Sequence, residues 1–240
     1  MKVIHRADTR GAADHGWLRS RHTFSFADYY EPERMSFGAL RVLNDDRVAG
    51  GRGFGLHPHE NMEIVSIPLK GALDHKDTTG REKVIRSGDV QIMSAGTGLM
   101  HSELNHSATE PVEFLQIWVL PQKRDIPPRY EQKTFSPDGR KNAWQVVVSP
   151  VENAASLWIN QSSWFSLANP EKGTSLEVET HVTGNGLYLF VIEGEVVLED
   201  ETLSRRDAVG LTKTGKLTLK AGQDSELLLI EVPMGGERSI

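Results

Sequence analysis

Two short elements in the first half of the chain carry residues that could hold a metal ion. His57 and His59 flank Pro58, and His101 stands two residues before Glu103. In an extended strand, residues two apart project from the same face, so each pair would present its two ligands together. If the two elements lie on facing strands of a barrel, three imidazoles and one carboxylate meet at one point. Nitrogen and carboxylate ligands without sulfur suit Fe, Mn, Co, Ni, Cu or Zn.

The distribution of histidine favours the first half as the site of this chemistry. Eight of the nine histidines lie within the first 106 residues. The remaining ones have plainer interpretations. We expect His15 and His22 to pack an N-terminal strand together with the aromatic residues Trp17, Phe24 and Phe26. His75 is expected in a solvated turn, His106 in an exposed loop, and His181 as an ordinary surface or packing residue.

Short apolar runs that are rich in β-branched residues must position these side chains. They recur with Gly, Pro, Asn or Asp between them, and sustained helical periodicity is hard to find. A spacing of ~8–12 residues with turn signals between the runs is typical of a β-sandwich or barrel. The sequence therefore predicts an all-β protein. Clear examples of such runs are residues 63–69, 114–120, 144–149, 187–192 and 227–232.

The two halves of the chain resemble each other in three blocks that occur in the same order. This predicts a duplicated barrel. The polar, proline-containing segment 121–143 between the copies is interpreted as a linker. The matched blocks are residues 64–71 with 187–194, 86–90 with 204–208, and 114–121 with 226–233.

The second copy lacks the candidate ligands. The register of the first block places Thr180 and Val182 opposite His57 and His59, and no His-x-Glu element precedes Leu217. The second barrel should therefore be free of metal and structural.

Composition excludes several other functions. The formal charge of −6 and the pI near 5.9 argue against a general nucleic-acid binder, because no basic field is available to displace counterions. The close basic pair Arg205-Arg206 is followed by Asp207 and is expected in a solvated turn. The absence of cysteine excludes disulfides, zinc ribbons, iron–sulfur clusters and thiolate nucleophiles. With no signal peptide or membrane span apparent, a cytoplasmic protein is the expectation.

Longer motifs around the candidate ligands resemble the pirin family of the cupin superfamily. The stretches GFGLHPHENMEIVSIPLKG (53–71) and QIMSAGTGLMHSELN (91–105) carry the resemblance, and residues 15–30 and 40–46 are similar to the family's N-terminal region. The similarity is dense over about residues 1–135 and holds in outline beyond. It implies a bicupin, two tandem jelly-roll barrels. The expected domains are 1–134, with the metal site, and 135–240, without one.

The resemblance also implies the ligand set. Pirin-type proteins bind one iron(II) through positions that correspond here to His57, His59, His101 and Glu103. Many cupins instead take a carboxylate from the first motif, which would nominate Glu63. At ~3.3 Å per residue, Glu63 lies ~13 Å along a straight strand from His59. It would need a sharp bend to reach the metal, so Glu103 is preferred.

Pirin-like proteins are associated with quercetin 2,3-dioxygenase activity, and the resemblance implies a metal-dependent dioxygenase that opens a flavonol. Four protein ligands on a six-coordinate metal leave two positions for water, dioxygen or a bidentate oxygen donor. With three neutral imidazoles and one carboxylate, a divalent metal site keeps a charge near +1, which favours binding of an anionic enolate or catecholate. Glu103 acts as ligand or proton acceptor. Expected partners are a small aromatic polyol and dioxygen. Two alternatives stay open: a metal- or redox-sensing regulator that binds a transcription factor or metabolic enzyme, and a non-oxidative cupin enzyme such as an isomerase.

Overall fold

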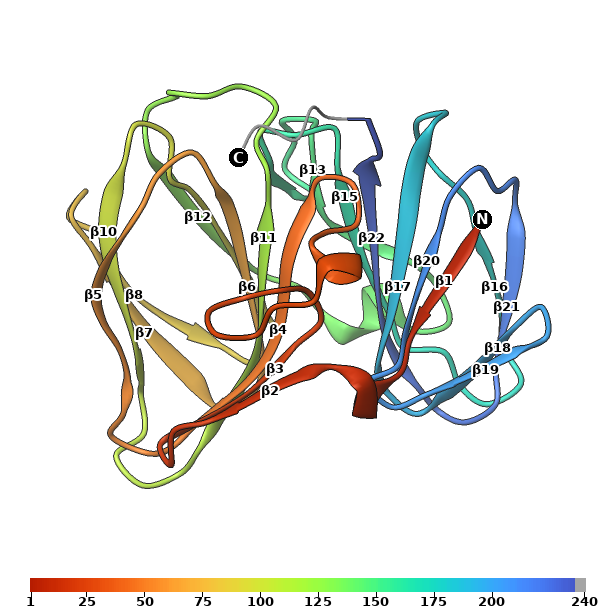
Figure 1. Ribbon diagram of the computed structural model, residues 1–240, viewed down its shortest axis with the longest axis horizontal. Coiled ribbons are helices and arrows are strands. Elements are labelled where there is room, and N and C mark those ends of the chain that lie inside the picture. The colour runs from red at the N-terminus through yellow and green to blue at the C-terminus, as the bar shows by residue number, and fades with distance from the viewer. Residues whose placement is uncertain (236–240) are drawn as a thin grey trace.

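The chain folds into two β-barrels that lie side by side, each built from a seven-stranded and a four-stranded sheet (Figure 1). The computed structural model describes residues 1–235. Besides strands and loops, these residues form three short 3-10 helices, η1 (Ala7–Thr9), η2 (Pro32–Arg34) and η3 (Pro137–Arg140). None of the described helices is long and apolar enough to cross a membrane. The prediction of an all-β fold with two tandem barrels is confirmed.

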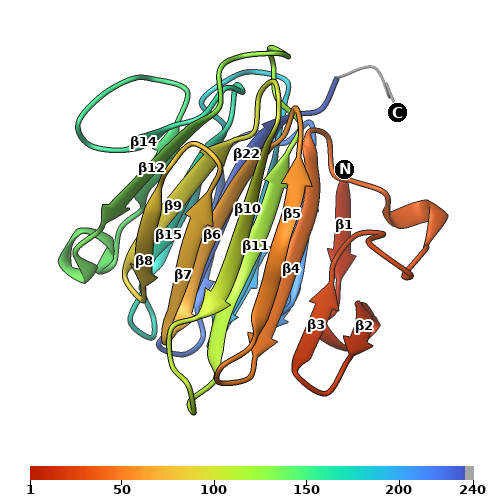
Figure 2. The ribbon, with the colours of Figure 1, turned by 90° about the vertical axis from the view of Figure 1, so that its left-hand side faces the viewer.

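In the first barrel, the seven-stranded sheet has the order β12-β9-β6-β11-β4-β3-β2, and the four-stranded sheet has the order β5-β10-β7-β8. Figure 2 shows the smaller sheet in front of the larger one. The strands of the larger sheet are β2 (Gly11–Asp14), β3 (Leu18–His22), β4 (Leu40–Val48), β6 (Glu63–Lys70), β9 (Asp89–Ser94), β11 (Val112–Val119) and β12 (Arg129–Thr134). Those of the smaller sheet are β5 (Gly53–His59), β7 (Ala72–Asp77), β8 (Glu82–Arg86) and β10 (Leu99–Asn105).

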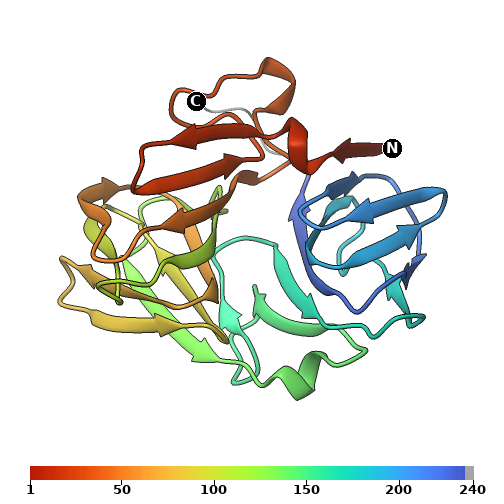
Figure 3. The ribbon, with the colours of Figure 1, turned by 90° about the horizontal axis from the view of Figure 1, so that it is seen from below.

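The second barrel repeats this plan with the sheet orders β1-β20-β17-β22-β15-β13-β14 and β16-β21-β18-β19. Its first sheet includes the N-terminal strand, so the start of the chain runs along both barrels (Figure 3). The strands of that sheet are β1 (Lys2–His5), β13 (Gln145–Ser149), β14 (Leu157–Trp158), β15 (Trp164–Ala168), β17 (Asn185–Glu193), β20 (Ala208–Leu211) and β22 (Glu226–Pro233). The other sheet holds β16 (Ser175–Val178), β18 (Glu195–Leu198), β19 (Glu201–Ser204) and β21 (Leu217–Ala221).

The three repeated sequence blocks fall on equivalent strands. β6 lies between β9 and β11 in the first barrel, as β17 lies between β20 and β22 in the second. The turns match as well: Gly71 and Gly194 have φ angles of 79° and 87°, and Gly88 and Arg206 have 94° and 68°. Residues in this left-handed region are usually glycine. The sequence register therefore extends to the backbone conformation of the turns.

The apolar cores of the two barrels differ. A shared cluster packs the two large sheets against each other, with Phe24 and Phe37 of the first half on Tyr188 of the second. Inside the second barrel the described apolar residues form one continuous cluster. Inside the first they form two small ones, around Phe114 and around Ile64. The first barrel thus keeps room and polar residues in its interior.

The segment 121–143 is not simply a linker. Residues Arg129–Thr134 form β12, which pairs with β9 from Arg129 opposite Ser94 to Thr134 opposite Asp89. The strand is polar because it lies at the edge of its sheet with half-buried side chains. Its alternation therefore carries no clear apolar signal. The domain boundary expected between residues 134 and 135 stays a prediction.

The solvated turn expected at the basic pair is only half right. Arg205 is exposed and pairs with Glu193. Arg206 is buried between the barrels, where its Nε lies 3.0 Å from Asp45 and its Nη1 donates to the Ile192 carbonyl at 2.6 Å. The left-handed backbone at Arg206 turns this side chain inward beside its exposed neighbour.

Candidate metal centre

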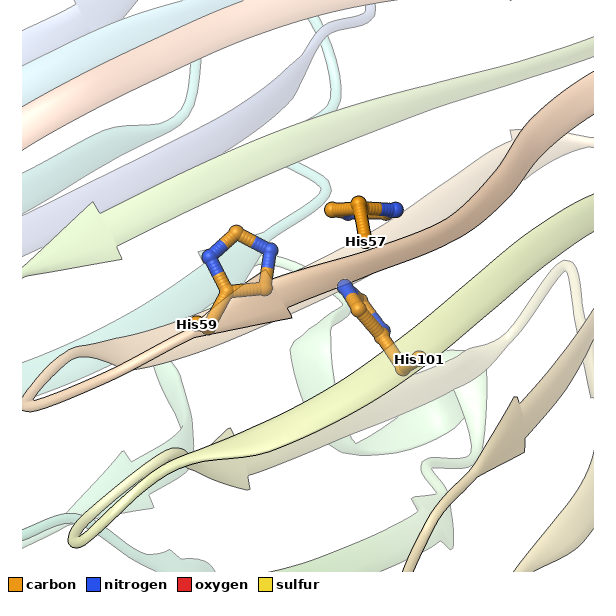
Figure 4. Close-up of side chains that lie close together, drawn as sticks. All are labelled: His57, His59 and His101. Carbon is orange, nitrogen blue, oxygen red and sulfur yellow. The ribbon is translucent and has the colours of Figure 1, made fainter.

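Three histidines converge on the inner face of the four-stranded sheet (Figure 4). His57 and His59 lie on β5, and His101 on β10 stands opposite His57 in the strand register. One ring nitrogen from each lies within 4.8 Å of the others. The ring centroids are 4.4 Å apart for His57 and His101, 4.8 Å for His59 and His101, and 4.9 Å for His57 and His59. A single cation could contact all three.

The pairing of the two ligand-bearing strands differs from the predicted one. β5 and β10 are hydrogen-bonded neighbours in one sheet and not facing strands of two sheets. Cross-strand neighbours on the same face have Cβ atoms ~5 Å apart, which is close enough for their rings to share an ion. The alternation that aims the rings inward leaves the intervening Leu56, Pro58 and Met100 exposed.

Glu103 is buried two residues beyond His101 on β10, and it is held by hydrogen bonds. Gln116 Nε2 donates to its carboxylate at 2.6 Å, and Ser66 Oγ donates at 3.2 Å. The strand register shifts between His101 and Glu103, so Glu103 stands opposite Phe54. Its carboxylate groups with His101 and His75 within 4.8 Å, rather than with the trio of His57, His59 and His101. Burial raises the pKa of Glu103 to about 7.

The expectation of a solvated turn at His75 is wrong. His75 lies on β7 with 1 % of its surface exposed, and its Nε2 lies 2.9 Å from Asp77 Oδ2. Its ring is 5.3 Å from that of His101 and 4.7 Å from that of Tyr130. Leu73, His75 and Asp77 are the inward positions of the strand. The spacing of His75 and Asp77, two residues apart, was the signal that could have revealed this strand. The charged residues Asp74 and Lys76 obscured the alternation of its inward and outward positions.

The electrostatics of the trio fit a metal. Both ring nitrogens of His101 are buried and have no hydrogen-bond partner among the described residues. Burial, with His57 and His59 nearby, lowers the pKa of His101 far below its usual range, and burial lowers that of His59 to about 4. His57 Nδ1 donates to the Gly55 carbonyl at 2.7 Å, which leaves Nε2 as the ring nitrogen available to a metal. Unprotonated imidazoles with unpartnered nitrogens are what a divalent transition metal binds.

A cavity of about 800 Å³ opens onto His57, His59 and Glu103. Its walls come largely from the N-terminal region and from aromatic residues. His15, Trp17, His22 and Phe26 were expected only to pack a strand, but all four line the cavity, while Phe24 packs in the core as expected. The other lining side chains include Ser20, Tyr29, Asn44, Asp46, Phe54, Gln116 and Trp118.

The rejected alternative ligand Glu63 is engaged elsewhere. Its carboxylate accepts hydrogen bonds from Ser94 Oγ at 2.9 Å and from the Asn160 backbone N–H at 3.2 Å. It is buried on β6, in the opposite sheet from the three histidines. Within residues 1–235, Glu63 belongs to no group of three close metal-ligating side chains.

The second barrel contains no comparable group in the part of the chain that the structure describes. Its histidine, His181, is half exposed, stacks on Trp164 at 4.7 Å and bonds Glu231 through Nδ1 at 2.7 Å. This agrees with the surface or packing role expected from the sequence. The apolar cluster of this barrel occupies the interior where the first barrel has its cavity.

Fold and site together define a bicupin whose first barrel holds a histidine-lined cavity. The family models for pirin and for the quercetinase C-terminal cupin domain match residues 4–119 and 146–232. The chain belongs to the pirin family. Quercetin 2,3-dioxygenase of Escherichia coli K12 is 40 % identical over 237 residues, covering 97 % of this chain and 99 % of that protein.

Two further proteins are similar to this chain over nearly its whole length. A putative quercetin 2,3-dioxygenase of Zymomonas mobilis is 39 % identical, covering 92 % of this chain and 93 % of its own. The crystal structure of the bacterial pirin YhhW from Escherichia coli in complex with nickel(II) superposes with a TM-score of 0.92 at 39 % identity. That match covers 97 % of this chain and 99 % of YhhW.

Proposed function

We propose that this protein is a metal-dependent dioxygenase that opens the central ring of a flavonol such as quercetin. One divalent metal is held by His57, His59 and His101, with Glu103 as the fourth ligand. The observation that carries the proposal is the convergence of three imidazoles, two of which, His57 and His59, line a cavity of about 800 Å³. Relatives named quercetin 2,3-dioxygenase at about 40 % identity, and a nickel(II) complex of one bacterial pirin, support it.

The ligand chemistry suits iron(II), which we propose as the native metal, and it also suits Mn, Co, Ni, Cu and Zn. When bound, such a metal supplies Lewis-acid and redox chemistry toward an enolate oxygen and dioxygen. Glu103 lies on the same strand as His101 and would join the ligands by giving up part of its bonding to Ser66 and Gln116.

Glu103 also has the properties of a proton acceptor for the substrate hydroxyl. Its pKa, raised to about 7, matches the operating pH of a general base. Gln116 and Ser66 fix its orientation toward the cavity. The rings of Trp17, Phe54 and Trp118 form flat apolar walls that pack against an aromatic substrate and exclude water.

The test combines metal analysis with oxygen uptake. Protein loaded anaerobically with iron(II) should bind one metal per chain and consume oxygen when quercetin is added. His59→Ala and His101→Ala should lose stoichiometric metal and oxygen uptake, while circular dichroism retains the β signal. The matched control His181→Ala should keep both properties. Full metal binding by the first two variants would remove the proposed site.

A second candidate is a metal-dependent regulatory protein without turnover. It is favoured by the apolar side chains on the outer face of the ligand-bearing strands. Leu56, Met100 and Leu104 are 60 %, 38 % and 45 % exposed. In the same experiment, stoichiometric metal without oxygen uptake from quercetin or simple catechols would select this candidate over the dioxygenase.

A further inference from the structure

A second polar group lines the cavity, away from the three histidines. Ser20 and His22 on β3, and Asn44 and Asp46 on β4, are each at most 5 % exposed, and all four line the cavity. We call these four residues the distal cluster. Four buried polar side chains in an apolar barrel are costly unless their hydrogen bonds are made.

The distal cluster is connected internally but is not saturated. His22 Nδ1 bonds Asn44 Oδ1 at 2.9 Å and lies 3.3 Å from Ser20 Oγ, and Ser20 Oγ donates to Asp46 Oδ1. Among the described residues, His22 Nε2, Asn44 Nδ2 and Asp46 Oδ2 make no side-chain hydrogen bond. These atoms still have accessible surface, since the fully buried unpaired atoms are elsewhere. The cluster therefore offers both donors and acceptors to the cavity.

The strand register sets the distance between the distal cluster and the candidate metal centre. His22 stands opposite Asn44, and Asn44 stands opposite Gln116, which holds Glu103. Neighbouring strands lie ~4.8 Å apart, so His22 is ~10 Å across the sheet from Gln116. A fused aromatic ring system with a pendant ring spans a distance of this size.

The walls near the cluster are aromatic. The His22 ring lies 5.2 Å from that of Phe26 and stacks at 6.4 Å on that of Tyr29. Trp17 and Phe54 pack edge to face, 5.6 Å apart, along the same cavity. A flat ligand between these walls would have the histidine trio at one end and the distal cluster at the other.

We propose that the distal cluster is a recognition subsite for hydroxyl groups on the substrate ring far from the metal. This inference rests on the proposed function and deepens it, because it defines the substrate class as a flat aromatic polyol with hydroxyl groups at both ends. A phenolic O–H donates to Asp46 or to His22 Nε2, and Asn44 Nδ2 donates to a phenolic oxygen. A site built to bond hydroxyl groups rejects the analogue that lacks them, because its own polar atoms stay unpaired.

The test measures the anaerobic binding of two flavonols to the iron(II)-loaded protein, with tryptophan fluorescence as the readout. Quercetin has two hydroxyl groups on its pendant ring, and galangin has the same skeleton without them. The native protein should bind quercetin about tenfold or more tightly than galangin. Asn44→Leu and the near-isosteric Asp46→Asn should bring the ratio of the two dissociation constants toward one and leave galangin binding nearly unchanged.

Ser94→Ala is the matched control, because Ser94 is a buried serine of the same barrel that bonds Glu63 and does not line the cavity. It should keep the native ratio. Stoichiometric iron in every variant shows that the site is intact, and Asp46→Asn serves if Asn44→Leu does not fold. An unchanged ratio in a folded distal variant overturns the inference alone. Native protein that binds neither flavonol overturns it together with the proposed function.

Discussion

Burial favours the neutral form of three ionisable groups of the cavity, His59, Glu103 and Asp46. It lowers the pKa of His59 to about 4 and raises the pKa values of Glu103 and Asp46 to about 7. The cause is common to all, because a low-dielectric interior penalises the charged form of acids and bases alike. At neutral pH the His59 imidazole is ready to bind a metal, while each of the two carboxyl groups can give or accept a proton.

The ionisation of Asp46 should make the stability of the protein depend on pH. Its pKa is about 7 in the folded protein against 3.8 ordinarily, so between these values the folded state keeps a proton that the unfolded state releases. Raising the pH through this window therefore favours unfolding, by up to ~1.4 kcal/mol per pH unit, and has no further effect above it. The Asp46→Asn variant has no ionisable group at this position, so it lacks this loss of stability at high pH.

Urea denaturation of the native protein and Asp46→Asn between pH 4 and 8 measures the effect. The stability of the variant relative to the native protein should rise from pH 4 to about 7 and then level off. A difference in stability that does not change with pH would show that Asp46 ionises normally in its cavity.

The residues that the sequence could reveal were those with regular spacing. His57, His59 and His101 lie where strand alternation places them, because the His-x-His and His-x-Glu elements are uninterrupted strands. His75 was missed because Lys76 and Asp74 disguise the inward alternation of β7. The distal cluster was also missed, because its four residues come from strands far from the ligand motifs in sequence.

At the scale of elements, the loop between β9 and β10 positions His101. Gly96 in this loop has a φ of 49°, and a Cβ atom there would lie 1.9 Å from the Ile126 carbonyl oxygen. Thr97 N–H donates to the same carbonyl at 3.0 Å. The loop is thus fixed against the backbone that leads into β12, the strand that sequence patterning left within a linker.

Gly96→Ala tests this contact. It combines left-handed strain with a backbone clash, so we expect a loss of about 3 kcal/mol or more of unfolding free energy and weaker metal binding. Gly80→Ala is the control, since Gly80 has a φ of 87° but nothing within 4 Å of a Cβ; it should cost ~1 kcal/mol. Equal losses in chemical denaturation of the two variants would mean that the close approach at Gly96 is unimportant.

At the scale of the whole molecule, the two duplicated barrels differ in what fills their interiors. The second barrel has a continuous apolar core, while the first has a polar cavity and two smaller clusters. The repeated strands and turns could be predicted because they repeat in sequence. The pairing of β1 with β20 could not, because a single strand crossing to the other barrel leaves no periodic signal. The burial of Arg206 could not be predicted either, because its partner Asp45 belongs to the other half of the chain.

We expect one metal to bind in the first barrel and none in the second. Crystals of the metal-loaded protein, measured at the X-ray absorption edge of the metal, test it directly through the anomalous difference map. We expect one peak per chain, about 2.1 Å from a ring nitrogen of each of His57, His59 and His101. A peak beside His181 and Glu231, or one held by His75 and Glu103 without His57 and His59, would contradict it.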